Sequence, residues 1–182
     1  MKRIYWILFC FLPCIAFADT SPYVSLSAGY HELKISQRAG YSSSDVKLDG
    51  ATELISLGVK KEIAPDIYFA SELNLQLSQA SKKWDDPLTF SRKITEKNSY
   101  GLGVLIGRSF ENNYELYTKL GYQKAKLDFG ANDREKFIGV RYGVGGHYNI
   151  NNTFHIGLEY QYTDFDKELS EQIILGRLVQ YF

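Results

Sequence analysis

Three histidines, His31, His147 and His155, are the side chains of this sequence best suited to chemistry near neutral pH. A histidine serves as general base for a serine nucleophile when hydroxyl and imidazole come within hydrogen-bond reach. It also binds metal ions, and His147 and His155 are close enough in sequence to meet across a turn. Both chemistries depend on the elements that hold these side chains in place.

Those elements are predicted to be β-strands, because apolar residues recur with a period of two from Tyr23 onward. Eight such segments follow one another, and none contains an apolar run long enough for a membrane helix. The residues predicted to face lipid are Val24, Leu26, Ala28, Tyr30, Ile55, Leu57, Val59, Ile63, Phe69, Leu73, Leu75, Leu77, Tyr100, Leu102, Val104, Ile106, Phe110, Leu116, Leu120, Tyr122, Ile138, Val140, Tyr142, Val144, Tyr148, Ile150, Phe154, Ile156, Leu158, Tyr160, Tyr162, Ile174, Leu178 and Phe182. The interleaved, mostly polar residues would face an interior.

The connections between these segments alternate in length. Tight turns of three residues are predicted at 64–66, 111–113 and 151–153, each rich in turn-forming residues. Longer polar loops are predicted at about 34–50, 80–97, 128–135 and 164–170. Short turns on one side and long loops on the other are typical of bacterial outer-membrane barrels. The sequence therefore predicts an all-β fold, an eight-stranded antiparallel up-and-down transmembrane β-barrel.

The N-terminus has the pattern of a cleaved signal peptide. A basic start, Met1 to Arg3, precedes an apolar stretch that ends in a small-x-small site at Ala16 to Ala18. We expect residues 1–18 to be the signal peptide and residues 19–182 the barrel domain. Both cysteines, Cys10 and Cys14, would leave with the signal, so no disulfide is expected. The remaining charge is 19 − 21 = −2, which implies no basic surface for nucleic acid.

Charged residues on the inward face are predicted to pair inside the barrel. Three-residue turns would place Gly58 opposite Glu72, and Gly145 opposite Glu159, so that each glycine leaves room for a carboxylate. Four of the inward groups are expected at similar depth and one, Arg141, nearer the loops. The predicted neutral, hydrogen-bonded network consists of Glu72, Lys119, Arg141, Glu159 and Arg177.

Three parts of the sequence resemble the OmpA/OmpX-type family of small outer-membrane barrels. They are the run GVRYGVGGHYNINNTFHIGLEYQYTD from Gly139 to Asp164, the run LYTKLGY at 116–122 and the terminal Phe182. The resemblance implies a monomer in the outer membrane of a Gram-negative bacterium, in contact with lipopolysaccharide. It also implies that the barrel-assembly machinery reads Phe182, although Gln180 stands where the family usually has an aromatic residue. With Phe182 last, we expect no peptidoglycan-binding domain.

Some barrels similar to this family modify the acyl chains of lipid A with a histidine, a serine and an acidic partner. The residues two positions after the three histidines are Leu33, Asn149 and Gly157, so the serine spacing of the deacylases is absent. The strand alternation places all three histidines inside the barrel. We therefore predict no catalytic site and no cofactor. We also predict no metal site, because His147 and His155 lack a third ligand in view.

The loops remain as the functional surface. Arg38 in the first loop, and Lys83, Trp84 and Arg92 in the second, combine charge with aromatic character. Such a mixture suits lipopolysaccharide phosphates or an extracellular protein. We expect a non-enzymatic role in envelope structure or surface adhesion. The alternatives are a lipid A-modifying enzyme and a narrow low-conductance channel, since side chains just fill the interior of eight strands.

Overall fold

The computed structural model describes residues 20–35, 46–78, 81–86, 89–96, 98–111, 113–128, 134–166 and 169–182. Among these residues there is no helix long and apolar enough to cross a bilayer. The strands are β1 (Thr20–Ile35), β2 (Val46–Ala64), β3 (Ile67–Ser78), β4 (Ser81–Asp86), β5 (Thr89–Glu96), β6 (Ser99–Phe110), β7 (Tyr114–Asp128), β8 (Arg134–Asn149), β9 (Phe154–Phe165) and β10 (Leu169–Tyr181).

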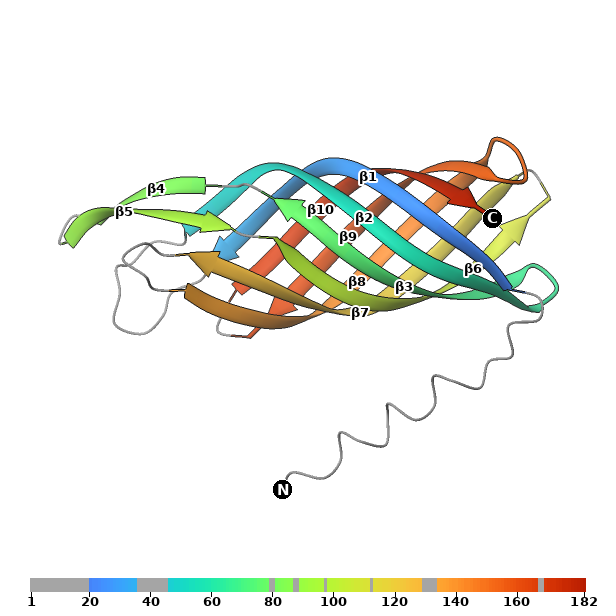
Figure 1. The fold of residues 1–182 in the computed structure, drawn as a ribbon, viewed down its shortest axis with the longest axis horizontal. Coiled ribbons are helices and arrows are strands. Elements are labelled where there is room, and N and C mark those ends of the chain that lie inside the picture. Colours follow the sequence, from blue (N-terminus) through green and yellow to red (C-terminus); the bar gives the residue numbers. More distant parts are fainter. Residues whose placement is uncertain are drawn as a thin grey trace, which may run out of the picture.

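Eight of the strands close into a barrel (Figure 1). Each pairs antiparallel with its neighbours in the order β1, β2, β3, β6, β7, β8, β9 and β10, and β10 pairs with β1 to close the ring. The remaining two, β4 and β5, form a hairpin that extends from one end of the barrel, where Thr95 and Glu96 pair with β7. The predicted eight-stranded up-and-down barrel is confirmed.

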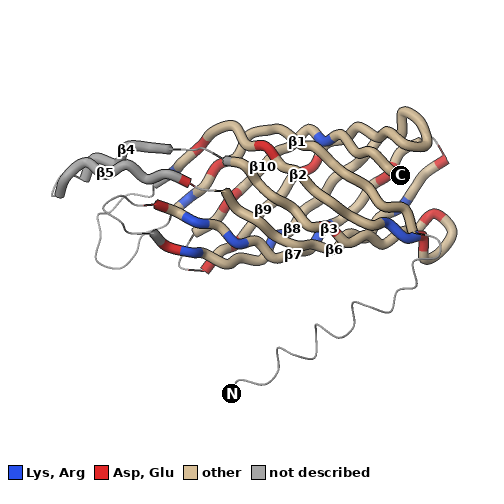
Figure 2. Tube along the Cα trace, viewed as in Figure 1, with Lys and Arg blue, Asp and Glu red and all other residues tan. Residues whose placement is uncertain are grey.

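The outer wall of the barrel is apolar. Every residue that the sequence predicted to face lipid is exposed or half-buried on the outside, with Leu102 57% and Leu158 70% exposed. Charged positions gather toward the strand ends near the β4–β5 hairpin (Figure 2). An apolar band between charged ends is the surface that a bilayer requires of a barrel.

The two ends of the barrel differ. The turn end holds the connections between β2 and β3, β6 and β7, and β8 and β9, and the loop end carries the β4–β5 hairpin. The second and third turns have the predicted three residues. The first is different, because only Pro65 and Asp66 connect the strands, and the ladder shifts its register between Glu62 and Ala64. That bulge restores the predicted pairing of Gly58 with Glu72.

The first turn depends on an unusual backbone angle at Asp66, whose φ is 62°. Its carbonyl accepts a hydrogen bond of 2.7 Å from the Ser109 backbone N–H, which ties the turn to β6. Asp66→Val should lower the free energy of unfolding by about 1–2 kcal/mol, because a β-branched side chain resists the left-handed conformation. Asp66→Gly should leave stability nearly unchanged in the same urea titration. Equal losses in the two variants would contradict this account.

At the loop end the strands run further than the sequence predicted. The loop predicted at 34–50 overlaps β1 and β2, which pair as far as Ile35 and Val46. There the ladder is supported by an ion pair of 3.1 Å between Lys47 and Glu32. The stretch predicted as a loop at 80–97 contains the β4–β5 hairpin. The prediction failed because strand residues in water need no apolar outer face, so their alternation disappears.

Candidate functional site

The interior of the barrel is filled in layers. Toward the loop end lies an apolar cluster of Leu33, Leu48, Ala125, Leu127, Phe137, Phe165 and Leu169. Toward the turn end lies a second cluster of Tyr23, Tyr68, Ala70, Leu105, Tyr117 and Val179, with Tyr181 against it. Between and beside these layers lie the buried charges, and such filling is expected of an eight-stranded barrel.

Four of the five residues predicted to share a network meet in the lumen. Lys119 Nζ donates to Glu72 and lies 3.3 Å from Glu159 Oε1. Arg177 donates to the same two carboxylates, at 2.6 Å for Glu159 and through Nη2 for Glu72. Each of the four is at most 3% exposed. Two cations thus share two carboxylates, and each carboxylate contacts both cations.

Glu159 also accepts a hydrogen bond of 2.7 Å from the hydroxyl of Tyr117. The two residues lie on either side of Gly145, which pairs with Tyr117 on one strand and with Glu159 on the other. A Cβ atom at Gly145 would lie 2.5 Å from the Tyr117 ring. The tyrosine ring therefore lies across the glycine and delivers its hydroxyl to the carboxylate.

The same arrangement recurs at Gly58, where the ring of Tyr23 occupies the space and its hydroxyl donates to Glu72 at 3.1 Å. At Gly107 the ring of Tyr68 lies in the equivalent place. The sequence analysis was wrong about what fills the room beside these glycines. The tyrosine rings fill it because they stack over glycine from the neighbouring strand, and the carboxylates lie beyond them.

Arg141 does not join the network. Its Nη2 donates to Glu171 at 2.9 Å and to Gln76 at 3.1 Å. Glu171 Oε1 lies 3.2 Å from His31 Nδ1, and Glu96 lies 3.5 Å from the other nitrogen of that ring. The structure thus divides the predicted network into two charged groups, and Arg141 belongs to the one nearer the loop end.

Sequence reasoning did not single out Glu171, Gln76 and Glu115, although the strand alternation already placed them among the inward residues. All three are buried in the lumen. Glu171 stands on β10 on the same face as Arg177, so the strand alternation that found the arginine also contains the signal for its neighbour. The three residues lie six, four and four residues along their strands from Arg177, Glu72 and Lys119, so a network predicted at one shared depth did not include them.

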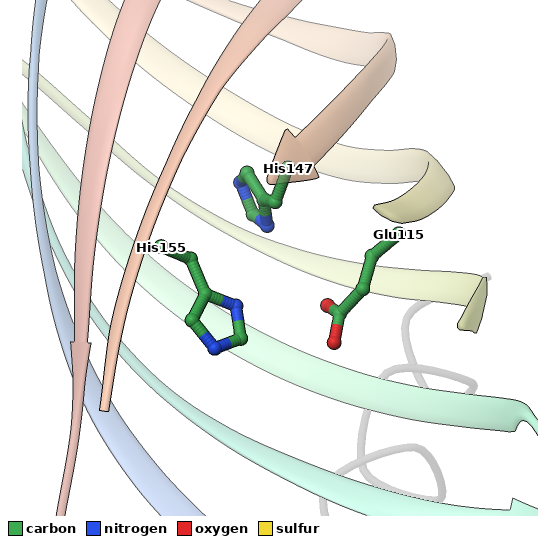
Figure 3. Close-up of side chains that lie close together, drawn as sticks. All are labelled: Glu115, His147 and His155. Atoms are coloured by element: carbon green, nitrogen blue, oxygen red, sulfur yellow. The ribbon is translucent and has the colours of Figure 1, made fainter. Parts of the chain in front are cut away.

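At the turn end, Glu115, His147 and His155 converge inside the barrel from three neighbouring strands (Figure 3). The three side chains are buried, and one ligand atom from each lies within 4.8 Å of the others. Lys60 donates to Glu115 Oε1 at 2.7 Å. All three histidines of the chain therefore lie inside, as predicted, and Glu115 is a third candidate ligand that the sequence analysis did not find.

The predicted surface contacts lie at the loop end where the structure describes them. Lys83 and Trp84 are on β4 and Arg92 is on β5, where Trp84 is paired with Arg92. Arg38 and the predicted signal peptide fall outside the described residues. Phe182 is 70% exposed, and its backbone N–H donates to the Pro22 carbonyl at 3.0 Å.

Comparison with known families finds one model over nearly the whole chain. The model is described as an outer membrane protein beta-barrel domain, and it matches residues 7–180. A search of curated protein sequences finds no significant match.

Solved structures with this architecture come from several bacteria. Ail, the attachment invasion locus protein of Yersinia pestis, solved with the heparin analogue sucrose octasulfate, is 20% identical over 88% of this chain and 99% of its own, with a TM-score of 0.56. Neisserial surface protein A is 18% identical over 90% and 99%, with a TM-score of 0.57. OprG from Pseudomonas aeruginosa is 10% identical over 90% and 97%, with a TM-score of 0.54. These likenesses establish a shared fold.

Proposed function

Since the chain belongs to the outer membrane β-barrel family, we propose that it is a non-enzymatic surface protein that attaches to polyanionic saccharides through its loop end. Its place is the outer membrane of a Gram-negative bacterium. The turns are on the periplasmic side of such barrels and the loops outside, so the β4–β5 hairpin extends from the cell.

The observation that carries the proposal is the arrangement of basic residues on this hairpin. Lys83 is paired directly with Lys93, and Arg92 occupies the next position of the ladder. Like charges placed directly opposite each other disfavour strand pairing. A ligand rich in phosphate or sulfate groups would neutralise these charges, and the sequence places an aromatic residue, Trp84, next to Lys83. The hairpin is therefore best suited to an anionic saccharide.

The comparisons support the class of ligand. Ail carries attachment in its name and was solved with a sulfated sugar. Lipopolysaccharide phosphates and sulfated glycans share the same clustered anionic oxygens, and basic side chains bind both by charge-assisted hydrogen bonds. The ligand is thus lipopolysaccharide of the same membrane or a sulfated glycan of another surface. Binding of an extracellular protein instead would be a different outcome of the test below.

The two alternative functions have less support. An acyl-modifying enzyme needs its base on a lipid-accessible face, whereas His31, His147 and His155 are each at most 5% exposed. A channel needs a continuous wet path, whereas apolar and charged layers fill the described lumen. Mass spectrometry of lipid A from a deletion strain should show an unchanged acyl pattern. A missing or additional acyl chain would replace the proposal with the enzyme.

The test of attachment is a triple variant, Lys83→Gln, Arg92→Gln and Lys93→Gln. Cells that display it should bind heparin-coated beads roughly tenfold less than cells with the unchanged protein, because three contacts of about 0.5 kcal/mol each are lost. The matched control is Lys61→Gln with Arg108→Gln, which removes basic residues near the turn end. The same variants are tested on vesicles of purified lipopolysaccharide, which separates the two sources of anion. Undiminished binding by the triple variant on both surfaces would refute the proposal.

A further inference from the structure

The group formed by Glu115, His147 and His155 has a composition that neither the barrel fold nor surface attachment requires. Glu115 on β7 is paired directly with His147 on β8, and His155 begins the next strand after the turn. Their side chains point toward one another in the lumen near its turn end (Figure 3). A ligand atom from each lies within 4.8 Å of the other two.

Four polar atoms of this group lack a partner in the part of the chain that the structure describes. Glu115 Oε2, both ring nitrogens of His147 and Nδ1 of His155 are buried and have no hydrogen-bond partner among the described residues. The three residues are at most 5% exposed. Buried polar atoms are as a rule hydrogen-bonded or bound to a metal ion. Four unpaired atoms within one small group therefore indicate a ligand.

We propose that Glu115, His147 and His155 bind one divalent transition-metal ion, Zn²⁺ in preference. Two imidazoles and one carboxylate are a common ligand set for zinc, which is bound at about 2.0–2.2 Å and leaves a fourth position for water. Tetrahedral ligands at that distance lie about 3.3 Å apart, so the ligand atoms need to approach one another by at most about 1.5 Å. Ca²⁺ and Mg²⁺ prefer sites made of oxygen atoms and are excluded by the two imidazoles.

The neighbouring residues hold the three ligands in place. The ring of Tyr117 lies 4.9 Å from that of His147, and the ring of Tyr181 lies 4.6 Å from that of His155. Lys60 donates to Glu115 Oε1 and leaves Oε2 for the ion. Such a hydrogen bond orients a ligating carboxylate, although the positive charge of Lys60 lowers the affinity for a cation.

The site has a route to solvent. A cavity of about 760 Å³ is lined by His155, Lys60, Tyr181, Asn113 and Asn149, among others. It lies at the turn end, so a hydrated ion would reach His155 from the periplasmic side. The surface attachment proposed above does not involve this end of the barrel, and either proposal can fail without the other.

A second group of similar composition provides an internal control. His31, Glu96 and Glu171 also have ligand atoms within 4.8 Å of one another. There, however, His31 Nδ1 contacts Glu171, and Glu171 accepts hydrogen bonds from Arg141 and Gln76. Its ligand atoms already have partners, so we expect no metal ion at this position.

The test uses protein purified from outer membranes in detergent, without a histidine tag. Calorimetric titration with Zn²⁺ should give one site per barrel, and Co²⁺ should give the visible absorption of a tetrahedral complex. His147→Gln, His155→Gln and Glu115→Gln should each weaken zinc binding at least tenfold, in line with the loss of one ligand. His31→Gln should bind as the unchanged protein does.

Each variant is run on a gel with and without boiling, because a folded barrel migrates differently from the boiled, unfolded chain. This control distinguishes a loss of zinc binding from a failure to fold. If a ligand variant fails to assemble, the decision rests on the unchanged protein, whose Co²⁺ complex must show the absorption of a tetrahedral site with nitrogen and oxygen ligands. The proposal is overturned if the unchanged protein does not bind Zn²⁺. It is equally overturned if the folded His147→Gln, His155→Gln double variant binds zinc like the unchanged protein.

Discussion

Replacing Glu159 by Gln is expected to lower the free energy of unfolding of the barrel by about 3–5 kcal/mol, the usual effect of breaking a buried ion pair. Glu159 accepts from Lys119, Arg177 and Tyr117, so the amide leaves two buried cations with Glu72 as their one carboxylate partner in the group. The measurement is equilibrium urea unfolding in lipid vesicles. Glu62→Gln, at an exposed position of β2, is the matched control and should change little.

A second substitution, Arg177→Met, tests whether these charges act as one group. Glu159→Gln with Arg177→Met leaves Lys119 with Glu72, a balanced pair in direct contact. The double variant should therefore recover part of the stability that the first substitution removes, with an interaction energy of about 1–3 kcal/mol. Purely additive losses would mean that water hydrates each charge separately.

Gly145→Ala is the second change for which we expect a large effect, a loss of about 2.5–4.5 kcal/mol in the free energy of unfolding. Its Cβ would lie 2.5 Å from the ring of Tyr117. The ring would have to move, which adds the overpacking of about 1–3 kcal/mol to the loss of a charged hydrogen bond of about 1.5 kcal/mol to Glu159. The loss is measured by the same urea titration.

Gly176→Ala is the control for this prediction. A Cβ there would be 3.7 Å from its nearest neighbour, the carbonyl oxygen of Ala28, which is an ordinary contact. The variant should retain the stability of the unchanged protein within about 0.5 kcal/mol. If Gly145→Ala and Gly176→Ala lose the same free energy of unfolding, the position of the Tyr117 ring does not depend on the absence of a side chain at Gly145.

The sequence predicted the wall of the barrel well, because the side-chain period of a strand is two and one face must meet lipid. Phe110 is opposite Tyr114 at the turn, and five steps back along each strand Leu105 is opposite Lys119, as the turn length predicts. Register within a hairpin follows from the turn and from the two faces alone. This local information sufficed for the eight strands of the barrel, for the inward position of the histidines and for five of the buried charges, Glu72, Lys119, Arg141, Glu159 and Arg177.

The sequence could not predict which charges meet across the lumen. Arg177 on β10 contacts Glu72 on β3, although two strands, β1 and β2, lie between them on one side of the ring. Such contacts depend on strand tilt and stagger around the closed barrel, and a pairwise register does not contain them. For the same reason Arg141 was assigned to the wrong group. Glu115 was not recognised beside the two histidines because no three-residue turn fixes the register of β7 and β8 that pairs it with His147.

The pairing of β1 with β10 also bears on how the molecule folds. The seam joins Tyr23 to Tyr181 and Ile35 to Leu169, so its contacts link residues far apart in the chain. Contacts between residues so far apart in the chain have a large entropic cost of loop closure, so they form late in folding. Until they form, β1 and β10 each present a free edge on which another chain could add a strand. The slow, aggregation-prone phase of assembly should therefore be the time before the ring closes, and changes at the seam should affect the folding rate more than changes in the hairpins.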